Sequence, residues 1–140
     1  MNIEEVRSFC ISKPFVTESF PFDEDTLVFK VCGKMFCLTS LSEPERINLK
    51  CEPEKAAELR EKFDCVIPGY HMNKKHWNTI MLIGDYSDSL LKEWIIKSYN
   101  LVYNKLPKKL KTRTQSMLAS IATSLLPVLT LFPCYCPVFP

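Results

Sequence analysis

The sequence predicts an α+β protein in which helices pack on one face of an antiparallel β-sheet. Two patterns support this fold class. Apolar residues alternate with polar ones over three short segments, as in strands with one buried face, and recur at spacings of three and four in other segments, as in amphipathic helices. At 140 residues the chain is long enough for one hydrophobic core without disulfide bonds. We therefore expect one globular domain.

The predicted elements follow one another in a simple order. They are a helix before Pro14, a hairpin with strands at 27–32 and 35–40, a strand at 46–51, a helix at about 53–63, a strand at 76–83 and a helix at 87–106. Proline supports two of these boundaries, because Pro53 suits the first turn of a helix and Pro107 cannot continue one. The fourth strand is favoured by the bulk of Trp77, Ile80 and Leu82.

The hairpin gives the most specific structural expectation. Its two strands are separated by Gly33-Lys34, which is typical of a two-residue turn that begins with glycine. Such a turn pairs Cys32 with Met35 and places Phe29 opposite Leu38 on the buried face. The other face of the hairpin is then expected to carry Lys30, Cys37 and Thr39.

Composition limits the classes of function. Lysine and arginine total 18 against 16 acidic residues, and a net charge of +2 is too small to indicate nucleic acid without a local basic surface. The seven cysteines are scattered and lack zinc-finger spacing, so we expect no structural zinc and no cofactor. The acidic, polar N-terminus does not have the pattern of a secretory signal, and we expect a cytoplasmic protein with reduced cysteines.

The composition changes abruptly near the C-terminus. Four basic residues at 108–113 precede a segment, 114–140, that contains no charged residue. We therefore expect a domain at 1–111 and a charge-poor, apolar, proline-rich tail at 112–140. Three interpretations of the tail stay open: contact with a membrane, packing on the domain or a partner, and an extension outside the family domain. Three prolines interrupt the apolar run, so membrane contact is not favoured.

Residues 68–79, with the sequence PGYHMNKKHWNT, have the composition of a binding surface. Two histidines, two lysines, two asparagines, a tyrosine and a tryptophan occupy twelve positions. A segment that only filled a core would be aliphatic, because buried His, Asn and Lys each need a partner. Hydrogen-bond donors and aromatic faces on a turn suit a surface that binds a polar, anionic partner.

Strand alternation predicts that further basic residues share the open face of the sheet with this turn. The candidate nucleic-acid-binding residues are Lys30, Lys34, Arg46, Lys50, His71, Asn73, Lys74, Lys75 and His76. Each has a structural alternative. The basic side chains could simply solvate an exposed face, while His71 and Asn73 could stabilise the turn and Trp77 could pack in the core.

The sequence gives little support for catalysis or metal binding. His71 and His76 straddle a predicted turn, and no third ligand lies nearby in sequence. Three isolated glycines cannot build a phosphate-binding loop, and no cysteine has an activating neighbour. We expect a non-enzymatic protein with no catalytic residue and no metal. An enzyme using the two histidines stays open if the fold brings a carboxylate or thiol to either ring.

Four segments occur together in a characteristic order: TESFPF at 17–22, the hairpin at 27–41, RINLKC at 46–51 and GYHMNKKHW at 69–77. With these segments the chain resembles the MmcQ/YjbR family over about residues 1–111. The resemblance implies a CyaY-like α+β fold and a DNA-binding role through a double-wing arrangement.

We therefore expect a small DNA-binding protein that contacts mainly the phosphate backbone, with weak sequence preference and strong salt dependence. The alternative is a protein-interaction module or a module that binds a small anionic ligand on the same face. A protein partner or a homodimer formed through the last helix of the domain is a further possibility.

Overall fold

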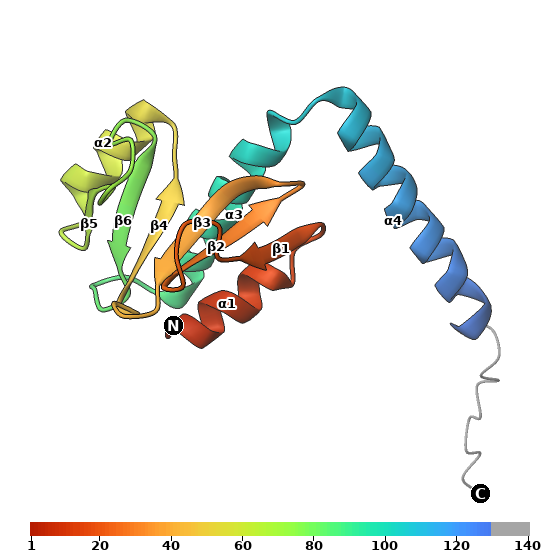
Figure 1. The fold of residues 1–140 in the computed structure, drawn as a ribbon, viewed down its shortest axis with the longest axis horizontal. Helices are drawn as coiled ribbons and strands as arrows, with labels where there is room; N and C mark the ends of the chain where they lie inside the picture. The colour runs from red at the N-terminus through yellow and green to blue at the C-terminus, as the bar shows by residue number, and fades with distance from the viewer. Residues whose placement is uncertain (130–140) are drawn as a thin grey trace, which may run out of the picture. The chain divides into compact units, whose positions relative to one another are not determined.

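The computed structural model describes the backbone of residues 1–129 and the side chains of residues 1–123. It divides into two compact units, Met1–Leu106 and a second unit that begins at Pro107 (Figure 1). The first unit contains three helices and all six strands, so the predicted α+β class is confirmed.

The six strands form one sheet in the order β1-β2-β3-β4-β6-β5, and all neighbouring strands are antiparallel. The strands are β1 (Val16–Ser19), β2 (Thr26–Val31), β3 (Lys34–Ser40), β4 (Arg46–Lys50), β5 (Val66–Pro68) and β6 (Trp77–Met81). The sequence did not predict the edge strands β1 and β5, because three or four residues are too few to show alternation.

Three helices of the first unit lie where the sequence predicts them: α1 (Ile3–Ile11), α2 (Pro53–Lys62) and α3 (Asp88–Asn104). Side chains cap two of their N-termini. The Asn2 side chain accepts a hydrogen bond from the Glu5 backbone N–H, and the Glu5 side chain accepts one from the Asn2 backbone N–H. The Ser87 hydroxyl accepts from the backbone N–H of Leu90 at the start of α3.

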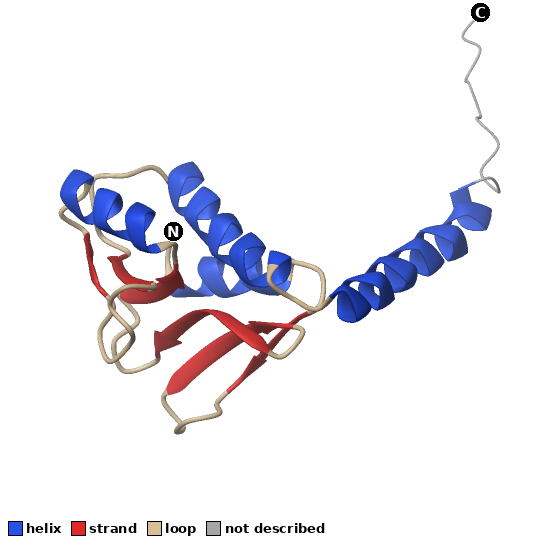
Figure 2. Cartoon of the chain, turned by 90° about the horizontal axis from the view of Figure 1, so that it is seen from above, coloured by secondary structure: helices blue, strands red, loops and turns tan. Residues whose placement is uncertain are grey.

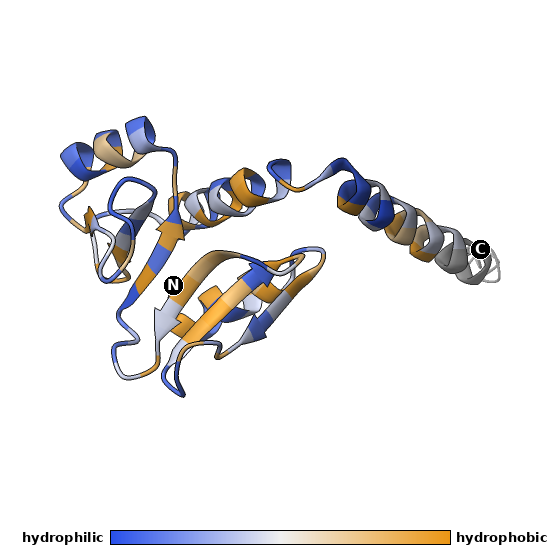
Figure 3. Cartoon of the chain, turned by 45° about the horizontal axis from the view of Figure 1, so that its top comes forward, coloured by the Kyte–Doolittle hydropathy of each residue, from blue (hydrophilic) through white to orange (hydrophobic). Residues whose placement is uncertain are grey.

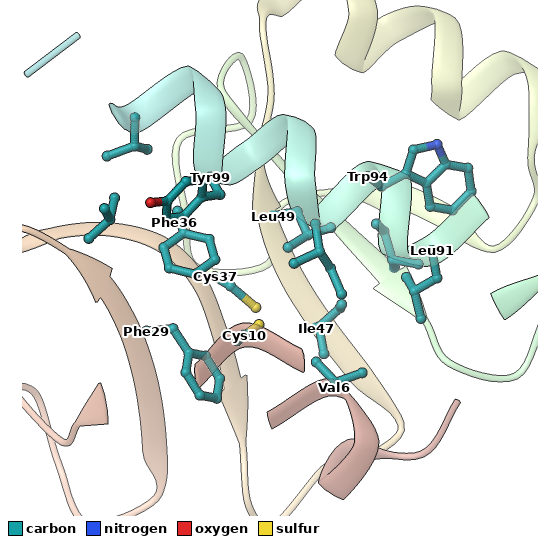
Figure 4. Close-up of a cluster of buried hydrophobic side chains, with 14 of the residues drawn as sticks. Val6, Cys10, Phe29, Phe36, Cys37, Ile47, Leu49, Leu91, Trp94 and Tyr99 are labelled. Carbon is teal, nitrogen blue, oxygen red and sulfur yellow. The ribbon is translucent and has the colours of Figure 1, made fainter. Parts of the chain in front are cut away.

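The main core lies between one face of the sheet and the helices (Figure 2). Its buried members come from α1, α3 and five strands: Val6, Cys10, Leu27, Phe29, Val31, Phe36, Cys37, Ile47, Leu49, Val66, Ile80, Leu91, Trp94, Ile95, Tyr99 and Val102. The rings of Phe36 and Tyr99 pack edge to face, with their centroids 5.5 Å apart. Figure 4 shows how these side chains converge from the helices and strands.

The hairpin differs from its predicted register. The turn is Cys32-Gly33, with φ of 48° and 80°, and it pairs Val31 with Lys34. Two positive φ values are typical of a turn whose twist matches that of the flanking strands. The register then shifts between Phe29 and Lys30, so that Phe29 lies opposite Cys37. The predicted pairing of Cys32 with Met35 and of Phe29 with Leu38 is therefore wrong.

This register also changes which side chains are buried. Cys37 and Thr39 point towards the helices and are fully buried, so their predicted place on the open face is wrong. The extra residue in β3 reverses the alternation that the sequence suggests. The Thr39 hydroxyl is satisfied by donating to the carbonyl of Arg46 at 2.9 Å. Lys30 lies on the face opposite Phe29, as the sequence predicts.

The second unit contains helix α4 (Lys108–Leu129). The basic residues of its first turns give way to a less hydrophilic sequence along the helix (Figure 3). Nowhere in the part of the chain that the structure describes is a helix long and apolar enough to span a bilayer. The predicted division at residue 111 stays a prediction, and the part of the tail at 130–140 lies outside the described residues.

Candidate nucleic-acid interface

The face of the sheet opposite α1 and α3, called here the open face, carries three of the predicted cations. Lys30 comes from β2, while Arg46 and Lys50 come from the two ends of β4. They share this face because Phe29, Ile47 and Leu49, their neighbours in sequence, all point into the main core. The alternation in β4 is therefore as predicted.

The centre of the open face is apolar. Val28, Leu38 and Trp77 form a second buried cluster there, with Met35 and Met72 packed against it. Trp77 is 6% exposed, so its ring packs in this cluster. The open face is therefore an apolar centre with basic side chains around it, and Trp77 takes the core position that the sequence left open for it.

The bend, residues 69–76, connects β5 to β6 and requires glycine at its first position. The Gly69 N–H donates to the Trp77 carbonyl at 2.9 Å, and a Cβ on Gly69 would lie 2.8 Å from that of Trp77. The backbone N–H of Tyr70 donates to the Thr79 hydroxyl at 2.9 Å. Because Thr79 lies opposite Asn48 on the open face, this bond draws the bend over that face.

Asn73 organises the second half of the bend. Its side-chain oxygen accepts from the Lys75 backbone N–H at 2.9 Å, and its carbonyl accepts from the N–H groups of His76 and Trp77. The structural role that the sequence left open for Asn73 is therefore present. His71 has a φ of 55°, which is uncommon for a residue with a side chain.

Arg60 of α2 holds the bend from the helix side. Its Nε donates to the Asn78 side-chain oxygen at 2.7 Å, and its Nη2 donates to the carbonyls of Lys74 and Trp77. The sequence alone did not predict this role of Arg60. The helical spacing of the sequence did indicate that Arg60 faces inward, because it lies four residues after the buried Ala56 of α2.

Three side chains form a cluster beside the bend, in which the planes of the Tyr70 and His71 rings are inclined by 57°. The guanidinium carbon of Arg46 lies 5.1 Å from the centroid of the Tyr70 ring, which in turn lies 4.1 Å from that of His71. Tyr70 is 54% exposed, and Arg46 also forms an ion pair with Glu43. Tyr70 was not among the predicted contact residues, although it lies within the segment that the sequence singled out.

The remaining cations gather at one end of the sheet. Because β4 is antiparallel to both β3 and β6, the start of β3, the end of β4 and the start of β6 lie at the same end of the sheet. The hairpin turn with Lys34 and the bend with Lys74 and Lys75 are therefore both at this end. Lys34, Lys74 and Lys75 are exposed, and within residues 1–123 none of them forms an ion pair. The Lys50 amino group lies 5.9 Å from the centroid of Trp77 at the same end.

The two histidines differ in their surroundings. His71 is exposed, whereas His76 is half-buried and its carbonyl accepts from the Cys51 N–H at 2.7 Å. Among the described residues, no cluster of three His, Cys, Asp or Glu side chains is placed to hold a metal ion. The prediction of a non-enzymatic protein stays a prediction.

These features define a class of protein: a small α+β domain with helices on one face of an antiparallel sheet and basic side chains around the other. Comparison with known families agrees with this class. The sequence model described as YjbR matches residues 11–101, more than half of the chain. The chain belongs to this MmcQ/YjbR family, as the resemblance predicts.

Two curated relatives support the assignment over most of the chain. The protein is 37% identical to YbdF of Escherichia coli O157:H7 over 113 residues, which cover 80% of this chain and 93% of YbdF. It is 33% identical to YjbR of Escherichia coli strain K12 over 110 residues, which cover 78% and 93% of the two chains.

Two solved structures support the fold. The crystal structure of Deinococcus radiodurans protein DR2400 matches with a TM-score of 0.75 and 40% identity, over 81% of this chain and 88% of that one. A crystal structure of a Pseudomonas syringae protein matches with a TM-score of 0.62 and 27% identity, over 72% and 98%. These similarities establish the family and its α+β fold.

Proposed function

We propose that the protein binds DNA, mainly through the phosphate backbone, with the open face and the bend as its contact surface. The observation that carries this proposal is the gathering of exposed lysines at one end of the sheet. Lys34 lies at the hairpin turn, and Lys74 and Lys75 lie in the bend. Lysine side chains that project from turns can neutralise phosphates and release their counterions.

The cluster of Arg46, Tyr70 and His71 beside the bend supports a second kind of contact. The exposed ring of Tyr70, with Arg46 next to it, offers a flat surface to an unpaired base. Such stacking tolerates any base, and phosphate contacts carry no sequence information. Both features favour binding with weak sequence preference.

The salt dependence of binding tests the proposal. Fluorescence anisotropy with a labelled duplex and with the corresponding single strand should show affinity that falls steeply as salt increases. In the double variant Lys74→Glu, Lys75→Glu, affinity should drop on all sequences by a similar factor. The slope of log affinity against log salt should become shallower by about 2, because two phosphate contacts are lost.

The matched control replaces two lysines with glutamate on a different surface of the protein. Lys62 and Lys92 are exposed on α2 and α3, the helices that cover the other side of the sheet. The double variant Lys62→Glu, Lys92→Glu should bind nearly as well as the unchanged protein. An equal loss in both double variants would show that only net charge matters, and no complex at low salt would end the proposal.

The other predicted class, a protein-interaction or small-ligand module on the same face, stays a prediction. The same holds for a homodimer and for the cytoplasmic location. Binding of DNA by the open face would remain compatible with a homodimer and with that location.

A further inference from the structure

A cavity of about 390 Å³ lies on the helix-covered side of the sheet, between α2 and α3. It is lined by residues from β4, β6, both helices and the segment before α2. Its volume falls in the range of small-molecule sites. All its lining residues belong to the first compact unit.

The floor of the cavity is apolar. Leu49 and Ile80 supply it from the sheet, and Trp94 supplies one wall from α3 (Figure 4 shows Leu49 and Trp94). The side chains of Leu59 and Leu101 complete the apolar part on the two helices. A ring or a short hydrocarbon chain placed here would be removed from water on several sides, which favours binding.

The rim of the cavity is polar. Three lysines, Lys50, Lys55 and Lys97, line it, together with one carboxylate, Glu52. Lys55 pairs with Glu58 at 2.7 Å, and Lys97 pairs with Glu93, each on its own helix, which fixes the directions of the two lysine side chains. An ammonium group has three donors, so such a pair leaves donors for a second anion.

We propose that this cavity binds a small amphipathic carboxylate, whose apolar body lies on the floor at Leu49, Ile80 and Trp94 and whose carboxylate meets Lys55 and Lys97 at the rim. The size of the cavity limits the body to one ring or a short chain. The ammonium donors of Lys55 and Lys97 that are not used in their ion pairs favour an anion over a neutral molecule of the same shape. This site differs from the proposed DNA-binding surface, because Lys34, Lys74 and Lys75 do not line the cavity.

The test uses 3-phenylpropanoate as the probe and 3-phenylpropanamide as its neutral counterpart, with the full chain labelled with ¹⁵N. The protein has two tryptophans, so each gives one indole N–H signal. Trp94 lines the cavity, and Trp77 lies in the apolar cluster of the open face. The carboxylate should shift the Trp94 signal saturably and leave Trp77 unchanged, and the amide should bind about tenfold more weakly.

A matched pair of variants on α3 tests the role of charge. Lys97→Gln should weaken binding of the carboxylate about three- to tenfold and leave binding of the amide unchanged. Lys92 is exposed on the same helix and does not line the cavity, so Lys92→Gln should have no effect. Equal weakening by both variants, or equal binding of carboxylate and amide, would overturn the proposal.

The rate at which Cys51 is alkylated gives a second measurement of binding, on the protein without substitutions. This half-buried thiol lines the cavity, whereas Cys65 does not. Saturating 3-phenylpropanoate should slow alkylation of Cys51, measured by mass spectrometry, without slowing that of Cys65. A Trp94 signal that does not move at millimolar probe would overturn the proposal, and DNA binding would be unaffected by that result.

Discussion

At the scale of single residues, Asp25 links three segments at the end of the sheet opposite the bend. Its carboxylate accepts hydrogen bonds from the hydroxyl of Ser40, the backbone N–H of Ser42 at 2.7 Å and the Ser42 hydroxyl at 3.0 Å. The bond from Ser40 is the largest cause of a pKa for Asp25 below its usual 3.8. The folded state therefore prefers the ionised carboxylate.

This preference predicts a pH-dependent effect of Asp25→Asn. A lowered pKa stabilises the fold above the usual value of 3.8, and this contribution is lost as the pH falls below it. The variant should therefore melt at a lower temperature than the unchanged protein at pH 7, and the difference should shrink towards pH 2. Thermal scans by circular dichroism at several pH values measure it, with the exposed Asp64→Asn as the control. A difference that is constant with pH would contradict the prediction.

Residues also show the limit of local patterns. The alternation in β4 correctly placed Arg46 and Lys50 on one face. The contact between Arg46 and Tyr70 could not be predicted, because it joins β4 to a bend that lies more than twenty residues later in the chain. A basic side chain that solvates a surface and one that stacks on an aromatic ring have the same local sequence signal.

At the scale of elements, α2 and the bend act as one structure. Arg60 donates to the side chain of Asn78 and to two backbone carbonyls, those of Lys74 and Trp77. Among the described residues of the bend, Met72 alone packs against the apolar cluster of the open face, so these bonds are a main constraint on the shape of the bend. The positions of the bend lysines depend on this helix.

We predict that Arg60→Ala lowers the free energy of unfolding by about 2 kcal/mol, because the Asn78 side chain and two backbone carbonyls of the bend then lose their charged hydrogen-bond donor. Amide hydrogen exchange should accelerate in the bend more than in β2 or β3. Urea denaturation and exchange measured by NMR check the two effects. Lys62→Ala, an exposed change on the same helix, should cost less than about 0.5 kcal/mol. Unchanged exchange in the bend would contradict the proposed role of Arg60.

At the scale of the whole molecule, the first unit contains a complete core. Every buried hydrophobic side chain of the described part lies between Val6 and Leu106. These side chains come from all three helices of the unit and from five of its strands. A core of this kind is enough for cooperative folding of a domain of this size.

A chain that ends at Lys111 should therefore fold. We predict one cooperative thermal transition, with a melting temperature within about 5 °C of that of the full chain. Near-ultraviolet circular dichroism, which reports the packing of Trp77 and Trp94, is the measurement. Loss of the cooperative transition would show that the segment after Lys111 is part of the folding unit.

The sequence by itself determined the fold class, three helices, four strands and the family, because apolar periodicity and the order of several segments persist without any long-range information. It also determined which residues could offer positive charge. Only the tertiary structure decided the register of the hairpin, the short edge strands, the apolar centre of the open face and the cavity beside Trp94. The register of the hairpin depends on a bulge, which the simple alternation of residues does not show. The other three depend on contacts between segments distant in sequence, and such contacts leave no periodic signal in either segment alone.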